Sequence, residues 1–147
     1  NLLLKEKIIY KNNKKCINFE IKVCDFGLTQ IFNRDKNNKI SFKCNKYVGK
    51  KLYKSPEIYS KNGYFDARFA DVWSLGVCLY MLLINSPPFT EATLKCQYFK
   101  CIIQGKLEYV LKKWNKIHYV DHYSIDLFNK IFVYENKRIN IQNILIH

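Results

Sequence analysis

Near its start the chain has two short apolar runs, residues 2–4 and 21–24, separated by a stretch rich in Lys and Asn. Short apolar runs flanked by polar residues are typical of β-strands. The pattern therefore predicts two strands joined by residues 5–20, which is a long connection for a hairpin. Residues 28–54 show no sustained period, so we expect a long loop there, and loops of that length are usually functional or disordered.

The pattern becomes helical after Ser55. Pro56 suits the first turn of a helix, and Asp66 can cap a second helix that runs to about Ile84. This second helix is apolar on nearly every side, so we expect it to be buried on every side and to form the axis of a bundle. The sequence Asn-Ser-Pro-Pro at 85–88 should end it.

Further amphipathic segments follow, and each is predicted to be helical because its apolar residues recur at helical spacing. They are residues 91–103, with Leu94, Tyr98 and Ile102 on one face, residues 124–132, with Leu127, Phe128, Ile131 and Phe132, and residues 139–146. The predicted fold class is therefore mainly α: a short β-hairpin followed by a helical bundle around one buried helix. No Gly/Ser-rich or Pro-rich stretch divides the chain, so residues 1–147 are expected to form one folding unit.

Composition changes this picture little. Of 147 residues, 48% are hydrophobic and 16% aromatic, which is enough apolar material for a packed core. The net charge of +13 raises the possibility of a nucleic-acid site. However, only Arg34, Arg68 and Arg138 among the 25 basic residues are arginines, and the lysines are scattered through loops. This distribution is more typical of a solvated surface, although it suits acidic peptide partners.

The cysteines and the longest apolar run indicate an intracellular protein. The six cysteines contain no C-x-x-C pair and no zinc spacing with His, so reduced thiols and a cytoplasmic location are expected. The longest apolar run, residues 72–84, is too short to cross a hydrocarbon core about 30 Å thick, so we expect no membrane partner. The amino terminus has no feature of a signal peptide.

Several short motifs occur in order along the whole chain. They are Asn1-Leu-Leu-Leu, Asp25-Phe26-Gly27, Gly49-Lys50-x-x-Tyr53-x-Ser55-Pro56-Glu57, Asp71-Val-Trp-Ser-Leu-Gly-Val, Pro87-Pro88-Phe89 and Arg138. A lone Asp-Phe-Gly could be only a turn that ends a strand. Together, the motifs resemble the eukaryotic protein-kinase family. The resemblance implies the carboxy-terminal, large lobe of a kinase catalytic domain, which is α+β as a whole.

By this resemblance, the first residues of the chain belong to the nucleotide site. Asn1 falls on the last position of the family's catalytic loop and Asp25 on the Asp of its D-F-G motif, and these two residues hold Mg²⁺. Cys24, Asp25, Phe26 and Gly27 would lie beside ATP, with Cys24 on the floor of its pocket. Phe26 would pack inward.

Residues 49–57 resemble the end of the activation segment, on which a substrate peptide lies. Gly49, Lys50 and Tyr53 would form this substrate platform, and Tyr53 favours Ser/Thr substrates over Tyr. Lys50 replaces the family's Thr, whose hydroxyl both donates and accepts hydrogen bonds, which an ammonium cannot do.

The resemblance also implies structural roles for three distant charged residues. Glu57 and Arg138 would form a buried ion pair that anchors the activation segment, and breaking such a pair costs roughly 3–5 kcal/mol. Asp71 would accept backbone hydrogen bonds from the catalytic loop.

The resemblance implies a protein kinase that transfers the γ-phosphate of ATP to Ser/Thr of protein substrates, with Mg²⁺ as cofactor and the small lobe of the same kinase as partner. The catalytic Asp and the family's phosphate-binding residues would lie before residue 1, so the chain alone is expected to be inactive. Two alternatives remain. Lys50 and the inserted residues 5–20 favour a pseudokinase or scaffold that binds proteins, and the basic charge favours, more weakly, a nucleic-acid-binding domain.

Overall fold

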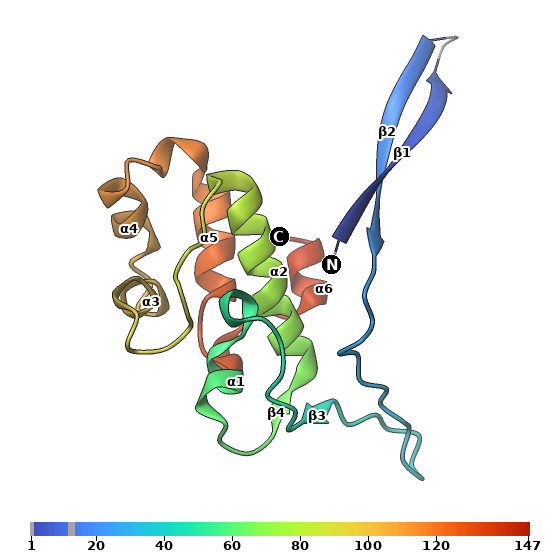
Figure 1. The fold of residues 1–147 in the computed structure, drawn as a ribbon, viewed down its shortest axis with the longest axis vertical. Coiled ribbons are helices and arrows are strands. Elements are labelled where there is room, and N and C mark those ends of the chain that lie inside the picture. The colour runs from blue at the N-terminus through green and yellow to red at the C-terminus, as the bar shows by residue number, and fades with distance from the viewer. Residues whose placement is uncertain (1, 12–13) are drawn as a thin grey trace. The chain divides into compact units, whose positions relative to one another are not determined.

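The computed structural model describes residues 2–11 and 14–147, so Asn1 lies outside the described residues. Contacts divide the chain into two compact units, Asn1–Ile31 and Phe32–His147, where the sequence predicts one. The elements, coloured along the chain in Figure 1, are β1 (Leu2–Lys11), β2 (Lys14–Val23), β3 (Lys43–Cys44), η1 (Lys51–Tyr53), α1 (Pro56–Ser60), β4 (Phe65–Asp66), α2 (Ala67–Ile84), α3 (Gln97–Ile103), α4 (Leu107–Lys113), η2 (Ile117–Tyr119), α5 (His122–Ile131), η3 (Glu135–Lys137) and α6 (Ile141–Leu145), where η marks a 3₁₀ turn.

The first unit is built on one antiparallel hairpin. β1 and β2 pair in continuous register from Leu2 opposite Val23 to Lys11 opposite Lys14. The predicted strands, residues 2–4 and 21–24, were therefore too short, and most of the predicted connection is itself strand. The signal was in β2, where apolar and polar residues alternate from Ile17 to Val23 with the period of a strand.

The second unit is organised around α2, whose ends follow the prediction. The Asp66 side chain caps the helix by accepting a hydrogen bond from the Arg68 amide at 3.0 Å. Asn85 ends it in a left-handed conformation, with its amide bonded to the Met81 carbonyl. The prediction that α2 is buried on every side was wrong, because Leu75 is 40% and Leu82 is 80% exposed.

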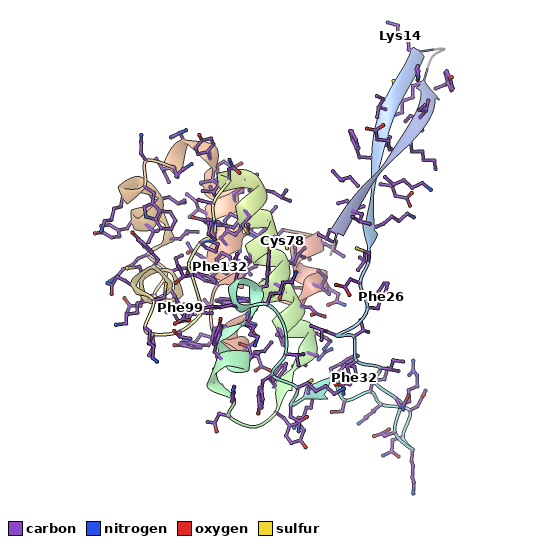
Figure 2. The ribbon with its side chains drawn as sticks, viewed as in Figure 1. Lys14, Phe26, Phe32, Cys78, Phe99 and Phe132 are labelled. Atoms are coloured by element: carbon purple, nitrogen blue, oxygen red, sulfur yellow. The ribbon has the colours of Figure 1, made fainter. Side chains whose placement is uncertain are left out.

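The opposite face of α2 lies in an aromatic core. Trp73 is fully buried, and its ring centroid is 5.2 Å from that of Phe132 and 5.5 Å from that of Phe89. Figure 1 shows α2 running alongside α5, and Phe99 and Phe132, labelled in Figure 2, belong to this core. Gly76 allows α2 to pack closely against the end of α5, because a Cβ at this position would collide with the Ile131 side chain. Helix α2 is therefore a core helix with one solvent-facing stripe.

The later helices agree with the sequence only in part. Helix α5 lies where 124–132 predicts it, and α6 is a shorter version of 139–146. The segment 91–103 is helical only from Gln97, because Cys96 has an extended backbone, and Leu94 is 59% exposed rather than on the packed face. Helix α4 was not predicted, although Leu107, Val110 and Leu111 show helical spacing and are buried.

Helix α2 also affects the expectation about membranes. It has 18 residues, more than the apolar run 72–84, and by length and composition alone it could cross a membrane. Core helices of globular proteins share these properties. The burial of Trp73, Val77 and Tyr80 in the aromatic core supports that assignment.

Candidate functional site

The Asp-Phe-Gly segment directly follows β2 in the first unit. Asp25 has a left-handed backbone, with φ of 63°, a conformation that Asp tolerates better than most residues. A turn follows, in which the Thr29 amide donates to the Phe26 carbonyl at 3.0 Å. Cys24 is half-buried, whereas Asp25 and Gly27 are exposed. The segment therefore presents a carboxylate on a sharply bent backbone.

The Phe26 side chain is 66% exposed, and the inward packing that the resemblance implies stays a prediction. A two-stranded hairpin offers no core that could enclose an aromatic ring, because its residues have neighbours on only one side.

The predicted substrate platform lies in the second unit, just before α1. Gly49 has a φ of 112°, a conformation that residues with a Cβ rarely adopt. It is followed by the η1 turn, in which the Tyr53 amide donates to the Lys50 carbonyl at 3.0 Å. The Ser74 hydroxyl on α2 donates to the Tyr53 carbonyl at 3.0 Å and so ties the platform to the core helix. The Lys50 side chain is exposed, with no hydrogen bond or ion pair to the residues that the structure describes.

The platform is continued by the Glu57–Arg138 ion pair, which joins residues 81 positions apart. The guanidinium donates to both carboxylate oxygens of Glu57, at 2.6 and 3.0 Å, and its side chain is fully buried. It also donates to the carbonyls of Phe69, Ile131 and Val133. A buried guanidinium with this many acceptors is fully satisfied, so the pair holds α1 against α2 and the segment after α5.

A face of Trp73 completes the surroundings of Arg138. The guanidinium carbon lies 4.9 Å from the Trp73 ring centroid, a cation–π distance. Trp73 also contacts Phe132 in the aromatic core. Arg138 therefore connects the platform directly to the most buried part of the unit.

Asp71, one turn into α2, has a different environment. Its carboxylate has no hydrogen-bond or ion-pair partner among the residues described, although the resemblance implies backbone donors for it. Asp71 is exposed as a whole residue, but neighbouring groups partly desolvate its carboxyl, and this desolvation raises the pKa of Asp71 above its ordinary value. The carboxylate is therefore available to a donor outside the described residues.

Comparison with known proteins agrees with the order of these motifs. The sequence profile of the family described as "Protein kinase domain" matches residues 1–147. This chain belongs to that family. Among curated relatives, it is 36% identical over 131 residues to serine/threonine-protein kinase SRK2A from Physcomitrium patens, covering 86% of this chain and 34% of the relative.

Two further relatives are also serine/threonine-protein kinases by name. The chain is 32% identical to serine/threonine-protein kinase 33 from Bos taurus, over 80% of this chain and 22% of the relative. It is 30% identical to probable serine/threonine-protein kinase fhkB from Dictyostelium discoideum, over 97% of this chain and 12% of the relative. The kinase-family chain thus spans about a third or less of these relatives' length.

Protein kinases generally use ATP and Mg²⁺, and the donor chemistry of this kinase-family chain can be tested against that pair. Mg²⁺ prefers oxygen ligands and is usually held by one or two carboxylates plus phosphates. The exposed Asp25 carboxylate fits this requirement, and the amide of Asn1, outside the described residues, is the second candidate. The described residues contain no group of three His, Cys, Asp or Glu side chains that could hold a metal unaided. These residues therefore fit a metal ion for which bound phosphates supply the other ligands.

Sequence reasoning missed one contact of the platform, an ion pair to the segment after α2. The Lys51 ammonium lies 2.8 Å from the Glu91 carboxylate, which also accepts a hydrogen bond from the Thr93 hydroxyl. The hydrogen bond with Glu91 raises the pKa of Lys51, and the same bond lowers the pKa of Glu91. No spacing rule relates residues 40 positions apart, so only the fold reveals this contact.

Proposed function

We propose that this chain is the carboxy-terminal lobe of a protein kinase that transfers the γ-phosphate of ATP to Ser or Thr of protein substrates. The chain would supply the substrate platform and part of the metal site. The residues that clamp the ATP phosphates, and the catalytic Asp, are outside residues 1–147, so the chain alone would not transfer phosphate. We also propose that it works in the cytoplasm.

The Glu57–Arg138 ion pair is the observation that carries this proposal. It fixes the end of the Gly49–Glu57 segment on the buried helices, with 2.6 Å between the Arg138 guanidinium and the Glu57 carboxylate. A peptide substrate must be held within a fraction of an ångström for phosphoryl transfer, so its platform needs a rigid base. The bond from Ser74 to Tyr53 supplies a second fixed point.

At the other end of the site, Asp25 would hold Mg²⁺, which neutralises charge on the phosphates of bound ATP. Asp25 follows β2 with a left-handed backbone, and the residue is exposed. Tyr53 would belong to the platform, and the residue type at this position favours Ser/Thr acceptors.

The proposal is tested with the longer protein that carries residues 1–147, using ATP labelled on the γ-phosphate and Ser, Thr and Tyr peptide mixtures. We expect transfer to Ser and Thr peptides only, and no transfer by residues 1–147 alone. Asp25→Asn should abolish transfer with little change in the melting temperature, because Asn tolerates the same left-handed backbone and the residue is exposed. Transfer to Tyr peptides alone, or full activity in Asp25→Asn, would contradict the proposal.

Lys50 favours a second candidate, a pseudokinase or scaffold that uses the same platform to bind proteins. Its ammonium cannot accept a hydrogen bond as the family's Thr does, so the link from the platform to the catalytic residues would be lost. Lys50→Thr in the longer protein separates the two candidates. An increase in transfer would show a working kinase held back at this position. Absence of transfer in both forms, with a protein partner still bound, would establish the scaffold.

A further inference from the structure

The positive charge of the second unit is concentrated in residues 32–54, here called the basic segment, which include the substrate platform. This segment contains eight basic side chains and one acidic side chain, so it carries a net charge of +7, whereas the whole chain carries +13. More than half of the net charge therefore lies in less than a sixth of the chain. Charge concentrated in this way attracts partners of the opposite sign.

Part of the basic segment is already engaged in contacts within the second unit. The Lys51 ammonium is paired with the Glu91 carboxylate at 2.8 Å, and the Lys54 ammonium donates to the Tyr47 carbonyl at 3.3 Å. The Arg34 guanidinium donates to a backbone carbonyl four residues further along, at 3.1 Å. The other five lysines are exposed, and their side chains have no hydrogen bond or ion pair to the residues that the structure describes: Lys36, Lys39, Lys43, Lys46 and Lys50.

The acidic residues of the chain leave these five lysines unneutralised. The first unit, residues 1–31, contains six lysines and three acidic residues, so it is itself positively charged. In the second unit, Lys43 is directly opposite Asp66 in the β3–β4 pair. Both carboxylate oxygens of Asp66 are bonded to the Arg68 guanidinium, however, at 2.6 and 3.0 Å. The five lysines are therefore available to negative groups of another molecule.

Two of the five, Lys46 and Lys50, flank the glycine of the platform. The Tyr47 hydroxyl donates to the Gly63 carbonyl at 2.6 Å, and the Tyr53 carbonyl accepts a hydrogen bond from α2 at 3.0 Å. These bonds anchor the backbone on both sides of Lys50 and directly after Lys46. The two lysines therefore extend from a backbone that is already ordered, so binding there costs less backbone entropy.

We propose that Lys46 and Lys50 select protein substrates that carry anionic side chains, carboxylate or phosphate, next to the acceptor Ser or Thr. The inference rests on the proposed function, because it concerns what the platform binds. The two ammonium groups would attract an anionic peptide and repel a basic one, so attraction and repulsion both contribute to the selection. Exposed ion pairs are weak one by one and are screened by salt, so the preference should be moderate and should decrease at high salt.

The first test uses the longer protein that carries residues 1–147 and Ser peptides that differ only in charge. One neutral peptide with a single acceptor Ser is made with Glu, phosphoserine, Gln or Lys on each side of that Ser. We expect kcat/KM for the Glu peptide to be about fivefold higher than for the Gln peptide and at least about tenfold higher than for the Lys peptide. A higher value for phosphoserine than for Glu would identify phosphate as the selected group. Equal kcat/KM for the Glu, phosphoserine and Gln peptides would overturn the inference and leave the proposed function intact.

Binding without transfer separates this inference from the proposed function. The same peptides, with Ala in place of the acceptor Ser, are titrated into the longer protein and followed by fluorescence anisotropy. Tighter binding of the Glu peptide than of the Gln peptide would support the inference even if no peptide is phosphorylated, a result that contradicts only the proposed function. Absence of transfer together with equal binding of the Glu, phosphoserine and Gln peptides would overturn both.

Charge exchange assigns the preference to the two lysines. In Lys46→Glu/Lys50→Glu, the ratio of kcat/KM for the Glu peptide to that for the Lys peptide should reverse, and in Lys46→Gln/Lys50→Gln it should approach one. If no peptide is phosphorylated, the ratio of the two affinities takes its place. Either ratio compares two peptides on the same variant, so a general effect of Lys50 on the rate cancels.

The matched control makes the same change in charge away from the platform. Lys106→Glu/Lys113→Glu alters two exposed lysines, one directly before α4 and one at its end, and should keep the ratio of the parent protein. An unchanged ratio in both platform variants would overturn the inference. An equal fall of the ratio in the control would do the same, because it would show a general effect of net charge.

Discussion

The hairpin of the first unit and the helices of the second use similar apolar residues in opposite ways. Phe19, on β2, is 56% exposed, whereas Phe132, after α5, is completely buried. A two-stranded sheet has one layer and cannot enclose its own side chains, whereas helices around α2 can. The comparison teaches that the first unit has no core of its own and that the aromatic core of this chain lies in the second unit.

The largest expected effect contrasts the two phenylalanines. Phe132→Ala removes a ring that packs against Trp73 and should lower the free energy of unfolding by about 4 kcal/mol. Phe19→Ala should change it by no more than about 0.5 kcal/mol, because the residue is exposed. Urea denaturation followed by tryptophan fluorescence measures both. Similar losses in the two variants would show that the hairpin shares the core.

Arg138→Ala tests whether the ion pair anchors the platform to the helical unit. It leaves the Glu57 carboxylate half-buried without its partner and should destabilise the unit by about 3 kcal/mol. Arg68→Ala is the matched control, because its ion pair with Asp66 is at the surface, and should cost less than about 1 kcal/mol. A melting temperature that is unchanged in Arg138→Ala would remove the main support for the proposed platform.

Gly76→Ala probes how closely α2 approaches the segment after α5. The added methyl group would collide with Ile131, and overpacking should outweigh the gain in helix propensity, for a net loss of about 1–2 kcal/mol. Ile131→Ala removes Cγ2, the atom that the added methyl group would meet, so Gly76→Ala should cost less in the Ile131→Ala chain than in the parent chain. If Gly76→Ala instead stabilises the protein, the two elements are less tightly packed than the structure indicates.

The smallest effect is expected at Asp71, and it depends on pH. The pKa of Asp71 is raised in the folded chain, so the folded state binds protons more strongly than the unfolded state does. The contribution of Asp71 to the free energy of unfolding is therefore most favourable at pH values below the ordinary pKa of Asp. This contribution is lost as the pH rises through the raised pKa of the folded chain. Above that range, Asp71→Asn should be slightly more stable than the parent chain, by about 0.5 kcal/mol or less.

Asp121 gives the matched control for this pH dependence. It caps α5 by accepting a hydrogen bond from the Ser124 amide, and this bond lowers the pKa of its carboxyl. The stability that Asp121 contributes should therefore be lost as the pH falls, whereas that of Asp71 is lost as the pH rises. Melting temperatures at a series of pH values should show opposite slopes for the changes caused by Asp71→Asn and Asp121→Asn. The same slope in both would show that Asp71 has an unrecognised donor.

Local signals predicted the parts of the fold that neighbouring residues decide. Asp66 and Asn85 bound α2 because capping depends on groups within one turn of the helix end. The prediction from spacing failed at Leu94. The helical pattern was taken to begin at residue 91, but Cys96 has an extended backbone and the helix begins only at Gln97. The hairpin was underestimated because β1 shows no alternation of apolar and polar residues, so only the alternation in β2 indicated a longer strand.

The candidate site divides in the same way. The Asp25-Phe26-Gly27 turn and the positive φ of Gly49 could be expected from residue type, because Asp and Gly tolerate left-handed backbone. The contact between Lys51 and Glu91 could not be expected in this way, because it depends on how the fold brings the η1 turn to the segment after α2.

The sequence by itself determined the family, through motifs that keep their order, and the strands and helices, through residues close together in the chain. Only the tertiary structure decided which apolar residues are buried and that Lys51 lies 2.8 Å from Glu91. Periodicity specifies the side of an element on which a residue lies. Burial and ion pairing depend on what packs against that side, which is set by contacts between residues far apart in the chain.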